Sequence, residues 1–423
     1  MQIQPCGPLR GELTVPGDKS ISHRAVMLGA LANGTTHITG FLMGEDCLST
    51  IDCFRKMGVE IEITDEAVIV EGVGLHGLCA PEDELYTGNS GTTTRLLCGI
   101  LAGQPFTATL NGDASIQKRP MGRVIKPLRE MGASIEGKND NYCPLTLYPS
   151  ELCGIEYRLP VASAQLKSAI LLAGLYAEGQ TTVIEPAPSR DHTERMFRAL
   201  GVEIDTDGNT ITLEPPEDLH AVDIAVPGDI SSAAFFLVAG TIVKGSALTI
   251  RNVGVNPTRT GILDVLREMG ADITVSNFRD EAEPVCDLTV QYSPLHGVEI
   301  GGSIIPRLID ELPVIAVAAA FAEGETVIRD AQELKVKESN RIAAMVTELG
   351  RAGVDVEETE DGMIIRGGKT PHGASFETYQ DHRIAMSLAV LALAAEGASR
   401  IDNPEVVAIS YPDFFTTLQQ LGG

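Results

Sequence analysis

The chain has 423 residues, of which 43% are hydrophobic and 21% charged, a balance that allows a sizeable buried core. Its 58 acidic and 32 basic residues give a formal net charge of -26, which argues against binding nucleic acid or anionic membranes. The 8 cysteines lack zinc-ligand spacing, the apolar runs are too short to span a membrane, and no signal peptide is evident. We therefore expect a cytoplasmic protein with free thiols and no metal site.

Two kinds of helix, each followed by a glycine, recur along the chain with a period of about 70 residues. An apolar helix precedes a glycine and then a β-rich stretch at Gly34, Gly103, Gly179, Gly245, Gly324 and Gly397. An amphipathic helix precedes a glycine at Gly58, Gly132, Gly201, Gly270, Gly353 and Gly422. Two independent markers with one period predict six copies of the same structural unit.

The third copy shows the expected elements in chain order. Residues 164–176 form an apolar helix, residues 181–185 a β-branched strand, and residues 193–200 an amphipathic helix. Residues 202–205 and 210–214 alternate on either side of an Asp-Gly-Asn turn, which predicts a hairpin. Each copy is therefore β-α-β-α-β-β. Six copies predict an α/β protein of two domains with three copies each, divided near Val226.

Cations stand at the starts of predicted helices, where the helix dipole disfavours them. These cations are Lys19, Arg95, Arg119, Lys167, Arg190, Lys337, Arg341 and Arg383. Glycine, serine and threonine gather at the same places, where free backbone N–H groups can hold an anion. The pattern predicts one anion site, built by several helix starts in an interdomain cleft, for small polyanionic substrates.

Acidic residues lie beside some of these cations. Asp310 precedes an apolar helix, Glu338 lies between Lys337 and Arg341, and residues 44–47 read as a capped helix start. Capping and ion pairing would explain each acid alone. Acid–base catalysis is the alternative, because carboxylates in a closed site can be tuned toward neutral pH.

Seven short motifs, spread over the whole chain and in a fixed order, resemble the enolpyruvyl transferase family. They are residues 16–24, 88–92, 119–121, 163–165, 336–341, 381–383 and 411–413. The resemblance implies a two-domain inside-out α/β barrel with three repeats per domain. One domain is residues 16–226, the other is residues 1–15 with 227–423, and the active site lies in the cleft between them.

The resemblance also implies the reaction. The enolpyruvyl group of phosphoenolpyruvate passes to the 5-hydroxyl of shikimate-3-phosphate by addition and elimination, and phosphate is released. This step belongs to chorismate and aromatic amino-acid biosynthesis. It needs no metal or organic cofactor, and we expect a monomer.

Site residues follow from the motifs by position. Shikimate-3-phosphate contacts are expected at Lys19, Ser20, Arg24, Ser163, Ala164, Gln165, Arg190, Asp310, Glu333 and Lys337. Phosphoenolpyruvate contacts are expected at Lys19, Asn89, Gly91, Arg119, Gln165, Arg341, His382 and Arg383. Asp310 would accept the 5-hydroxyl proton, while Glu338 and Lys19 would handle the protons at C3 and the leaving phosphate.

Some positions resemble the divergent class II subgroup of the family. Residues 190–194 and 256–259 carry its pattern, and Ala164 replaces a second serine. Arg190 would then grip a substrate. Gly91 is the small residue of glyphosate-sensitive members, so we expect glyphosate to inhibit the chain.

Three alternatives stay open. A transferase acting on UDP-N-acetylglucosamine would carry a cysteine where this chain has Ala114. An RNA-end cyclase or an RNA-binding protein built on a similar repeat unit is disfavoured by the acidity and by the 4% aromatic content. A non-catalytic phosphometabolite binder would keep the arginines but would not need Asp310 and Glu338.

Overall fold

The computed structural model describes residues 1–422, which divide into two compact units. The central unit is Gly17–Val226, and the split unit joins Met1–Pro16 to the residues from Pro227 onward. The chain therefore leaves the split unit after its second strand and returns to it just before its first helix. Each unit has its own hydrophobic core.

The central unit alternates helices and short strands. In chain order it contains α1 (Lys19–Leu31), β3 (Asn33–Thr39), α2 (Glu45–Lys56), β4 (Glu60–Ile63), β5 (Ala67–Val73), β6 (Leu85–Tyr86), α3 (Gly91–Ala102), β7 (Ala108–Asn111), η1 (Ile116–Lys118), α4 (Gly122–Glu130), β8 (Ser134–Lys138), β9 (Tyr142–Tyr148), β10 (Glu156–Arg158), α5 (Ala164–Gly174), β11 (Thr181–Ile184), α6 (His192–Ala199), β12 (Ile204–Asp207), β13 (Thr210–Leu213) and β14 (Ile224–Ala225).

The split unit repeats this alternation. It contains β1 (Gln2–Ile3), β2 (Arg10–Thr14), α7 (Ile230–Ile242), β15 (Ala247–Gly254), α8 (Gly261–Glu268), β16 (Asp272–Arg279), β17 (Val285–Gln291), β18 (Glu299–Ile300), η2 (Gly302–Arg307), α9 (Leu312–Phe321), β19 (Glu325–Ile328), η3 (Gln332–Val336), α10 (Arg341–Arg351), β20 (Asp355–Glu358), β21 (Met363–Arg366), β22 (Ser375–Phe376), α11 (His382–Ala394), β23 (Ser399–Ile401), η4 (Pro404–Ile409) and α12 (Phe414–Gln420).

One sheet plan recurs in both units. Two parallel strands flank an apolar helix, and an antiparallel hairpin completes the sheet, which gives the orders β6-β7-β9-β8, β10-β11-β13-β12 and β18-β19-β21-β20. This is the predicted β-α-β-α-β-β unit, and the predicted α/β fold class is confirmed. In the third copy the apolar helix ends at Gly174, two residues earlier than predicted.

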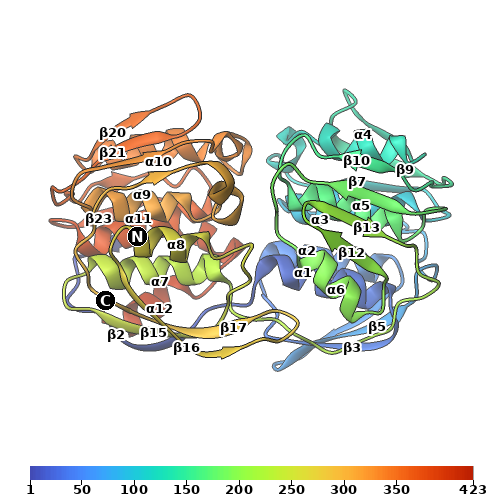
Figure 1. Cartoon of the computed structure of the whole chain (residues 1–423), viewed down its shortest axis with the longest axis horizontal. Coiled ribbons are helices and arrows are strands. Elements are labelled where there is room, and N and C mark those ends of the chain that lie inside the picture. The colour runs from blue at the N-terminus through green and yellow to red at the C-terminus, as the bar shows by residue number, and fades with distance from the viewer. Residues whose placement is uncertain (423) are drawn as a thin grey trace. The chain divides into compact units, whose positions relative to one another are not determined.

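Three sheets take a strand from a distant part of the chain. In the central unit, β14 pairs in parallel with β3 and so supplies the first strand of the first copy. In the split unit, β2 does the same for β15. The sixth sheet has the order β1-β23-β22, with the N-terminal strand β1 antiparallel to β23. Each unit is thereby closed by pairing between segments far apart in sequence (Figure 1).

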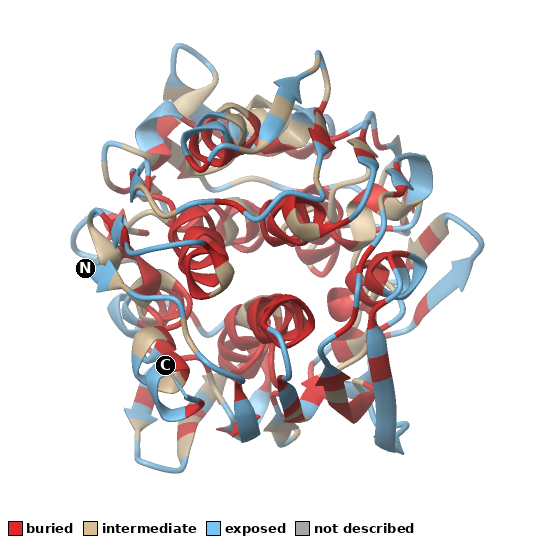
Figure 2. Ribbon diagram, turned by 90° about the vertical axis from the view of Figure 1, so that its left-hand side faces the viewer, coloured by how far each residue is buried: buried red, intermediate tan, exposed pale blue. Residues whose placement is uncertain are grey.

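The apolar helices occupy the inside of each unit, and the sheets form its outer surface. In the split unit, α7, α9 and α11 pack against one another and are almost wholly buried, whereas the sheets around them expose one face (Figure 2). In the central unit, α3 packs against α5 in the same way. Among residues 1–422 no helix has the length and apolar character that crossing a membrane requires.

The packing of α3 against α5 is closest at Gly99. A Cβ atom added at this position would overlap the backbone carbonyl oxygen of Ala169, so the two helix backbones are in contact there. In contrast, Gly350 in α10 is exposed, and a Cβ atom added to it would meet no atom within 4 Å beyond the adjacent residues and the backbone of its own helix. Close packing therefore requires glycine at position 99, whereas packing leaves room for a side chain at position 350.

We expect Gly99→Ala to lower the free energy of unfolding by about 1–3 kcal/mol, because the added methyl forces the helices apart. Gly350→Ala is the matched control and should raise it by about 0.5–1 kcal/mol through backbone entropy. Urea unfolding followed by circular dichroism measures both. An unfolding midpoint of Gly99→Ala at or above that of the unchanged chain would contradict the close packing.

Candidate active site

The predicted site residues lie at the starts of helices in both units. The central unit holds Lys19, Ser20, Arg24, Asn89, Gly91, Arg119, Ser163, Ala164, Gln165 and Arg190. The split unit holds Asp310, Glu333, Lys337, Glu338, Arg341, His382 and Arg383. The two sets belong to separate compact units, and the set in each unit is called the half-site of that unit.

Side-chain caps fix where these helices begin. Asp18, Ser90 and Ser163 each accept a hydrogen bond from a backbone N–H in the first turn of α1, α3 and α5. Asn340 and Asp381 do the same for α10 and α11. Such caps satisfy N–H groups that the helix itself leaves without partners. The residues that follow each cap are thereby held in the first turn, where the helix dipole favours anions.

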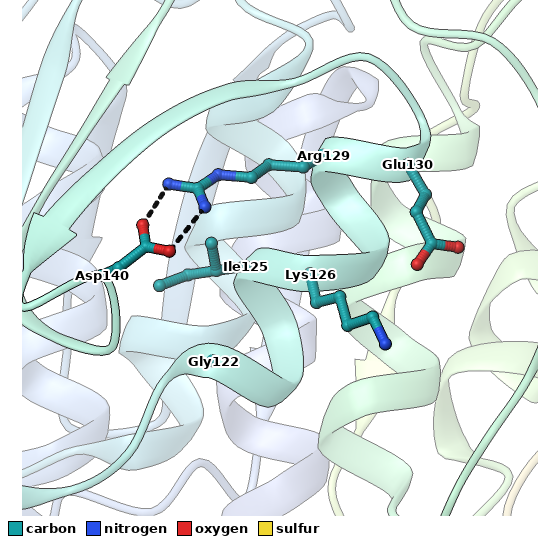
Figure 3. Close-up of a pocket in the computed structure, with 6 residues that line it drawn as sticks. All are labelled: Gly122, Ile125, Lys126, Arg129, Glu130 and Asp140. Atoms are coloured by element: carbon teal, nitrogen blue, oxygen red, sulfur yellow. Dashed lines mark hydrogen bonds and ion pairs between the residues drawn. The ribbon is translucent and has the colours of Figure 1, made fainter.

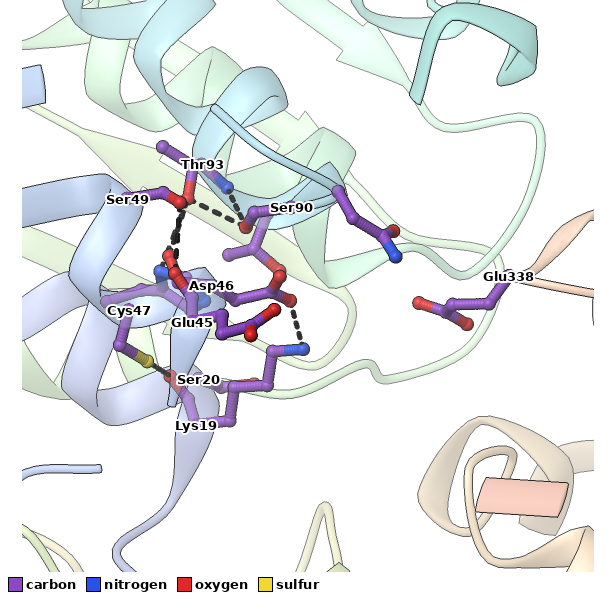
Figure 4. A network of polar contacts seen from close by, with 12 residues as sticks. Lys19, Ser20, Glu45, Asp46, Cys47, Ser49, Ser90, Thr93 and Glu338 are labelled. Atoms are coloured by element: carbon purple, nitrogen blue, oxygen red, sulfur yellow. Dashed lines mark hydrogen bonds and ion pairs between the residues drawn. The ribbon is translucent and has the colours of Figure 1, made fainter. Parts of the chain in front are cut away.

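The lysine at the start of α1 is held by a carboxylate of the neighbouring helix. Lys19 forms an ion pair with Asp46, which lies in the first turn of α2 (Figure 4). The N-cap of α2 is Gly44, which has no side chain, and Asp46 lies in the first turn, where the helix dipole favours a carboxylate. The sequence did not identify Asp46 as a site residue, because an acid in a first turn is ordinary.

Two arginines lie beside Gly91. Arg119 donates from Nη2 to Asn89 Oδ1 at 2.9 Å, and Arg95 donates from Nη1 to Gln165 Oε1 at 2.7 Å. A Cβ atom on Gly91 would lie 2.8 Å from Arg95 Nη1 and 3.1 Å from Arg119 Nη1. The structure therefore brings four predicted site residues together and adds Arg95, which the helix-start pattern singled out but the motifs did not.

Arg24 and Arg190 both reach the first turn of α1. Arg24 is buried, donates from Nε to Thr193 Oγ1 and from Nη2 to Ser168 Oγ, both at 2.7 Å, and also bonds the carbonyl of Ser20. Arg190 Nη1 lies 3.4 Å from Ser20 Oγ. Arg24 thus joins α1, α5 and α6, while Arg190 lies with Ser20 in this half-site.

The prediction that Lys167 contributes to the anion site is wrong. Its side chain is 1% exposed, and its ammonium group pairs with Glu185 at 2.9 Å and with Glu194 at 2.7 Å. Burial lowers the pKa of Lys167, but the two carboxylates outweigh it and hold the pKa above its ordinary value. The charge of this lysine is therefore paired with two carboxylates inside the central unit.

A buried histidine links the first three helices of the central unit. His23 Nδ1 lies 2.7 Å from Thr50 Oγ1, and Thr50 shares a 2.8 Å hydrogen bond with Thr93. Thr93 in turn donates to Ser90, the N-cap of α3, as Figure 4 shows. Burial, together with the charges of Lys19 and Arg24, lowers the pKa of His23 well below 6.5.

In the split unit, Arg341 is the centre of the half-site. Its guanidinium is 1% exposed and donates to Asp381 at 2.8 Å, Glu338 at 2.6 Å and Asp310 at 3.2 Å. Lys337 Nζ also lies 3.2 Å from Asp310. One buried cation at the start of α10 therefore gathers three carboxylates from separate segments, and Asp310 is shared by two cations.

The electrostatics of this cluster follow from its burial. Burial alone would lower the pKa of Arg341, but Asp381, Glu338 and Asp310 raise it far above its ordinary value. For Asp381 burial acts in the opposite direction and raises the pKa. The positive charge of Arg341 outweighs burial, so the pKa of Asp381 lies below its ordinary value. Asp310 keeps 12% of its side chain exposed, while Lys337 and Arg341 both hold its carboxylate.

The remaining predicted residues of the split unit flank this cluster. His382 and Arg383 are buried at the start of α11, where the N–H of Arg383 bonds the capping carboxylate of Asp381 at 2.9 Å. Glu333 is half-buried on η3, four residues before Lys337. Asp381 was part of a recognised motif but was not predicted as a site residue.

A separate hollow lies beside α4. It is lined by Gly122, Ile125, Lys126, Arg129, Glu130 and Asp140 (Figure 3). Arg129 donates two hydrogen bonds to Asp140, at 3.0 and 2.6 Å, so its positive charge is already paired within this hollow. No predicted site residue lines this hollow.

Among residues 1–422 no three His, Cys, Asp or Glu side chains are grouped to hold a metal ion.

A family model described as EPSP synthase (3-phosphoshikimate 1-carboxyvinyltransferase) matches residues 3–418. The chain belongs to the EPSP synthase family. A relative from Geobacillus kaustophilus, named 3-phosphoshikimate 1-carboxyvinyltransferase, is 61% identical over 418 residues and covers 98% of both chains. A relative of the same name from Geobacillus thermodenitrificans is 60% identical over 417 residues, covering 98% of this chain and 96% of its own.

Solved structures agree with this assignment. EPSP synthase from Acinetobacter baumannii is 48% identical, with a TM-score of 0.89 over 100% of this chain and 98% of its own. The enolpyruvyl transferase NikO from Streptomyces tendae is 21% identical, with a TM-score of 0.81 over 100% and 97%, and shows the shared fold. The resemblance predicted from the seven motifs is confirmed, and the chain is a transferase of the shikimate pathway.

Because His23 is held neutral in the fold, the stability of the chain should depend on pH. An unfolded histidine binds a proton below about pH 6.5, whereas the buried His23 does not. The contribution of His23 to the free energy of unfolding is therefore constant above pH 6.5. On acidification it falls by about 1.4 kcal/mol per pH unit, until the pH reaches the pKa of His23 in the folded chain.

We expect His23→Gln, which keeps a polar side chain without a titrating ring, to remove this part of the slope. Urea unfolding at pH 7.5 and pH 5.5 measures the difference between the unchanged chain and the variant. The variant should be less destabilised relative to the unchanged chain at the lower pH. A difference that is the same at both pH values would contradict a neutral buried His23.

Proposed function

We propose that the chain, acting as a cytoplasmic monomer, transfers the enolpyruvyl group of phosphoenolpyruvate to the 5-hydroxyl of shikimate-3-phosphate and releases phosphate. The catalytic roles proposed below are supported by the position of the Asp310 carboxylate, which lies 3.2 Å from both Lys337 Nζ and Arg341 Nη1. No two of the 8 cysteines within residues 1–422 are joined by a disulfide, which suits a reducing compartment.

The first step is an addition. The 5-hydroxyl oxygen bonds to C2 of phosphoenolpyruvate, its proton passes to Asp310, and C3 gains a proton to become a methyl group. Lys337 and Arg341 orient the Asp310 carboxylate, because each donates a hydrogen bond to Oδ1. Glu338, which Arg341 holds at 2.6 Å, supplies the proton to C3.

The second step is an elimination. The C2–O bond to phosphate breaks, one proton passes from C3 back to Glu338, and the double bond re-forms in the product. Lys19 protonates or neutralises the departing phosphate, and Arg119, Arg341 and Arg383 stabilise the negative charge that develops. The substrates carry two phosphates and two carboxylates, which accounts for so many cations in a chain of net charge -26.

The arrangement of acids favours this reaction over a binder. A protein that only held the anions would gain from cations alone, whereas three carboxylates around Arg341 would weaken anion binding. The sugar-nucleotide alternative would use a thiol at position 114. In this chain Asp113 bonds the N–H groups of Ser115 and Ile116 at 2.8 and 2.9 Å, so Ala114 lies in an ordered turn before η1 and offers no such group.

Phosphate release from phosphoenolpyruvate tests the proposal directly. We expect release with shikimate-3-phosphate and none with UDP-N-acetylglucosamine. Release only with the sugar nucleotide would overturn the substrate assignment. Absence of release with either acceptor, also after addition of potassium and ammonium ions, would overturn the catalytic assignment in favour of a binder.

Asp310→Ala separates chemistry from binding. We expect turnover to fall by about 10²–10⁴-fold, while equilibrium binding of shikimate-3-phosphate stays within about threefold. Lys19→Met should damage both, because Lys19 is placed in both substrate sets. Asp280→Ala, an exposed aspartate in the same unit as Asp310, is the matched control and should behave like the unchanged chain. Near-normal turnover of Asp310→Ala would overturn the assignment of the base.

A further inference from the structure

A fully buried charge cluster lies in the central unit, and none of the steps above uses it. The ammonium group of Lys167 on α5 lies between Glu185, at the end of β11, and Glu194, on α6. The exposed fractions of the three side chains are 1%, 4% and 3%. Removing three charges from water is costly, and an apolar cluster would often be as stable. The charges therefore call for a reason other than stability.

The cluster is joined to the segment that carries Arg190. Residues 186–190 connect β11 to the start of α6 and contain two prolines. Ser189, the residue just before Arg190, donates its hydroxyl to Glu185, and its carbonyl oxygen lies 3.4 Å from Lys167 Nζ. The hydroxyl and the carbonyl group of Ser189 are thus tied to the buried charges, and Arg190 is the next residue in the chain.

The same cluster fixes the start of α6. Glu194 follows Thr193, whose hydroxyl shares a 2.7 Å hydrogen bond with Ser168, the neighbour of Lys167. The helices α5 and α6 are thereby joined by two adjacent pairs of residues. Arg24 also donates to both Thr193 and Ser168, so α1 is tied to this joint as well.

Arg190 is placed by this framework at the first turn of α1, with Nη1 3.4 Å from Ser20 Oγ. A guanidinium grips a phosphate or carboxylate through paired hydrogen bonds whose geometry is narrow. A segment held at only one end would let Arg190 sample many positions. Such freedom would lower the affinity for the anion.

We propose that Lys167 is a positioning residue, and that its ion pairs with Glu185 and Glu194 act through Ser189 to hold Arg190 for the phosphate of shikimate-3-phosphate. This inference rests on the proposed function. It predicts an effect on one substrate alone, because the residues expected to contact phosphoenolpyruvate in this unit, such as Asn89, Gly91 and Arg119, make none of these contacts.

The mildest test is Ser189→Ala, which removes the link but leaves the ion pairs intact. We expect its KM for shikimate-3-phosphate to rise about tenfold, with kcat and the KM for phosphoenolpyruvate within about twofold of the unchanged chain. Ser150→Ala, which removes another backbone-bonding serine of the same unit, is the matched control and should leave all three constants unchanged.

A double-mutant cycle with Arg190→Ala tests whether the effect passes through the arginine. In the Arg190→Ala background, Ser189→Ala should raise the KM for shikimate-3-phosphate no further. Lys167→Met alone would leave two buried carboxylates without a cation and could prevent folding. The triple variant Lys167→Met, Glu185→Gln, Glu194→Gln removes all three charges with little change in volume, and should reproduce the rise in KM.

The outcomes distinguish the two levels of the proposal. Absence of turnover with shikimate-3-phosphate in the unchanged chain would overturn the proposed function itself. Turnover with a KM that rises in Arg190→Ala but not in Ser189→Ala or the triple variant would overturn the positioning role and keep the function. A fall in the urea midpoint of these variants with an unchanged KM would show a merely structural cluster.

Discussion

A positive charge in the first turn of a helix is unfavourable unless an anion accompanies it, and this constraint organises both units. Carboxylates of the chain itself compensate two of these positive charges. Asp46 accompanies Lys19, and Asp310, Glu338 and Asp381 surround Arg341. The many cations at helix starts are thereby held in defined positions. The same positions are those at which a polyanionic substrate would meet N–H groups and cations together.

The fold makes this arrangement possible by burying its apolar helices. Because α1, α3 and α5 lie inside the central unit, and α7, α9 and α11 inside the split unit, their starts are fixed by tight packing. The contact of Gly99 with the backbone of α5 shows how little room remains. Strands β1, β2 and β14 then close the units with segments from distant parts of the chain.

The cations serve two different purposes. In the central unit, Lys19, Arg24, Arg119 and Arg190 are predicted substrate contacts. Arg24 also joins the helices of this unit, and Lys167 does so alone. The difference is one of burial and of partner. Lys167 keeps its charge because two carboxylates compensate for its loss of water, and it can therefore act as a fixed joint rather than as a ligand.

The sequence alone determined the repeat of about 70 residues, the two kinds of helix, and the residues at each helix start. The sixth copy differs from the others, because β1 takes the place of its hairpin. The features that the sequence determined depend on local rules: apolar periodicity, capping side chains, and glycines beyond helix ends, of which Gly58, Gly132 and Gly201 have φ between 89° and 105°. The motif residues Asp310, Glu338 and Arg341 were found for the same reason, since each is recognised from its immediate neighbours.

Only the tertiary structure decided which charge meets which. Lys19 and Lys167 look alike in the sequence, because each stands in the first turn of an apolar helix after a capping residue. One lies in the half-site beside Asp46, while the other is buried between Glu185 and Glu194. Their partners come from other elements, and the distance between two elements is set by sheet pairing and helix packing. Electrostatic energy depends on that distance and on burial, and neither is encoded in the residues beside the lysine.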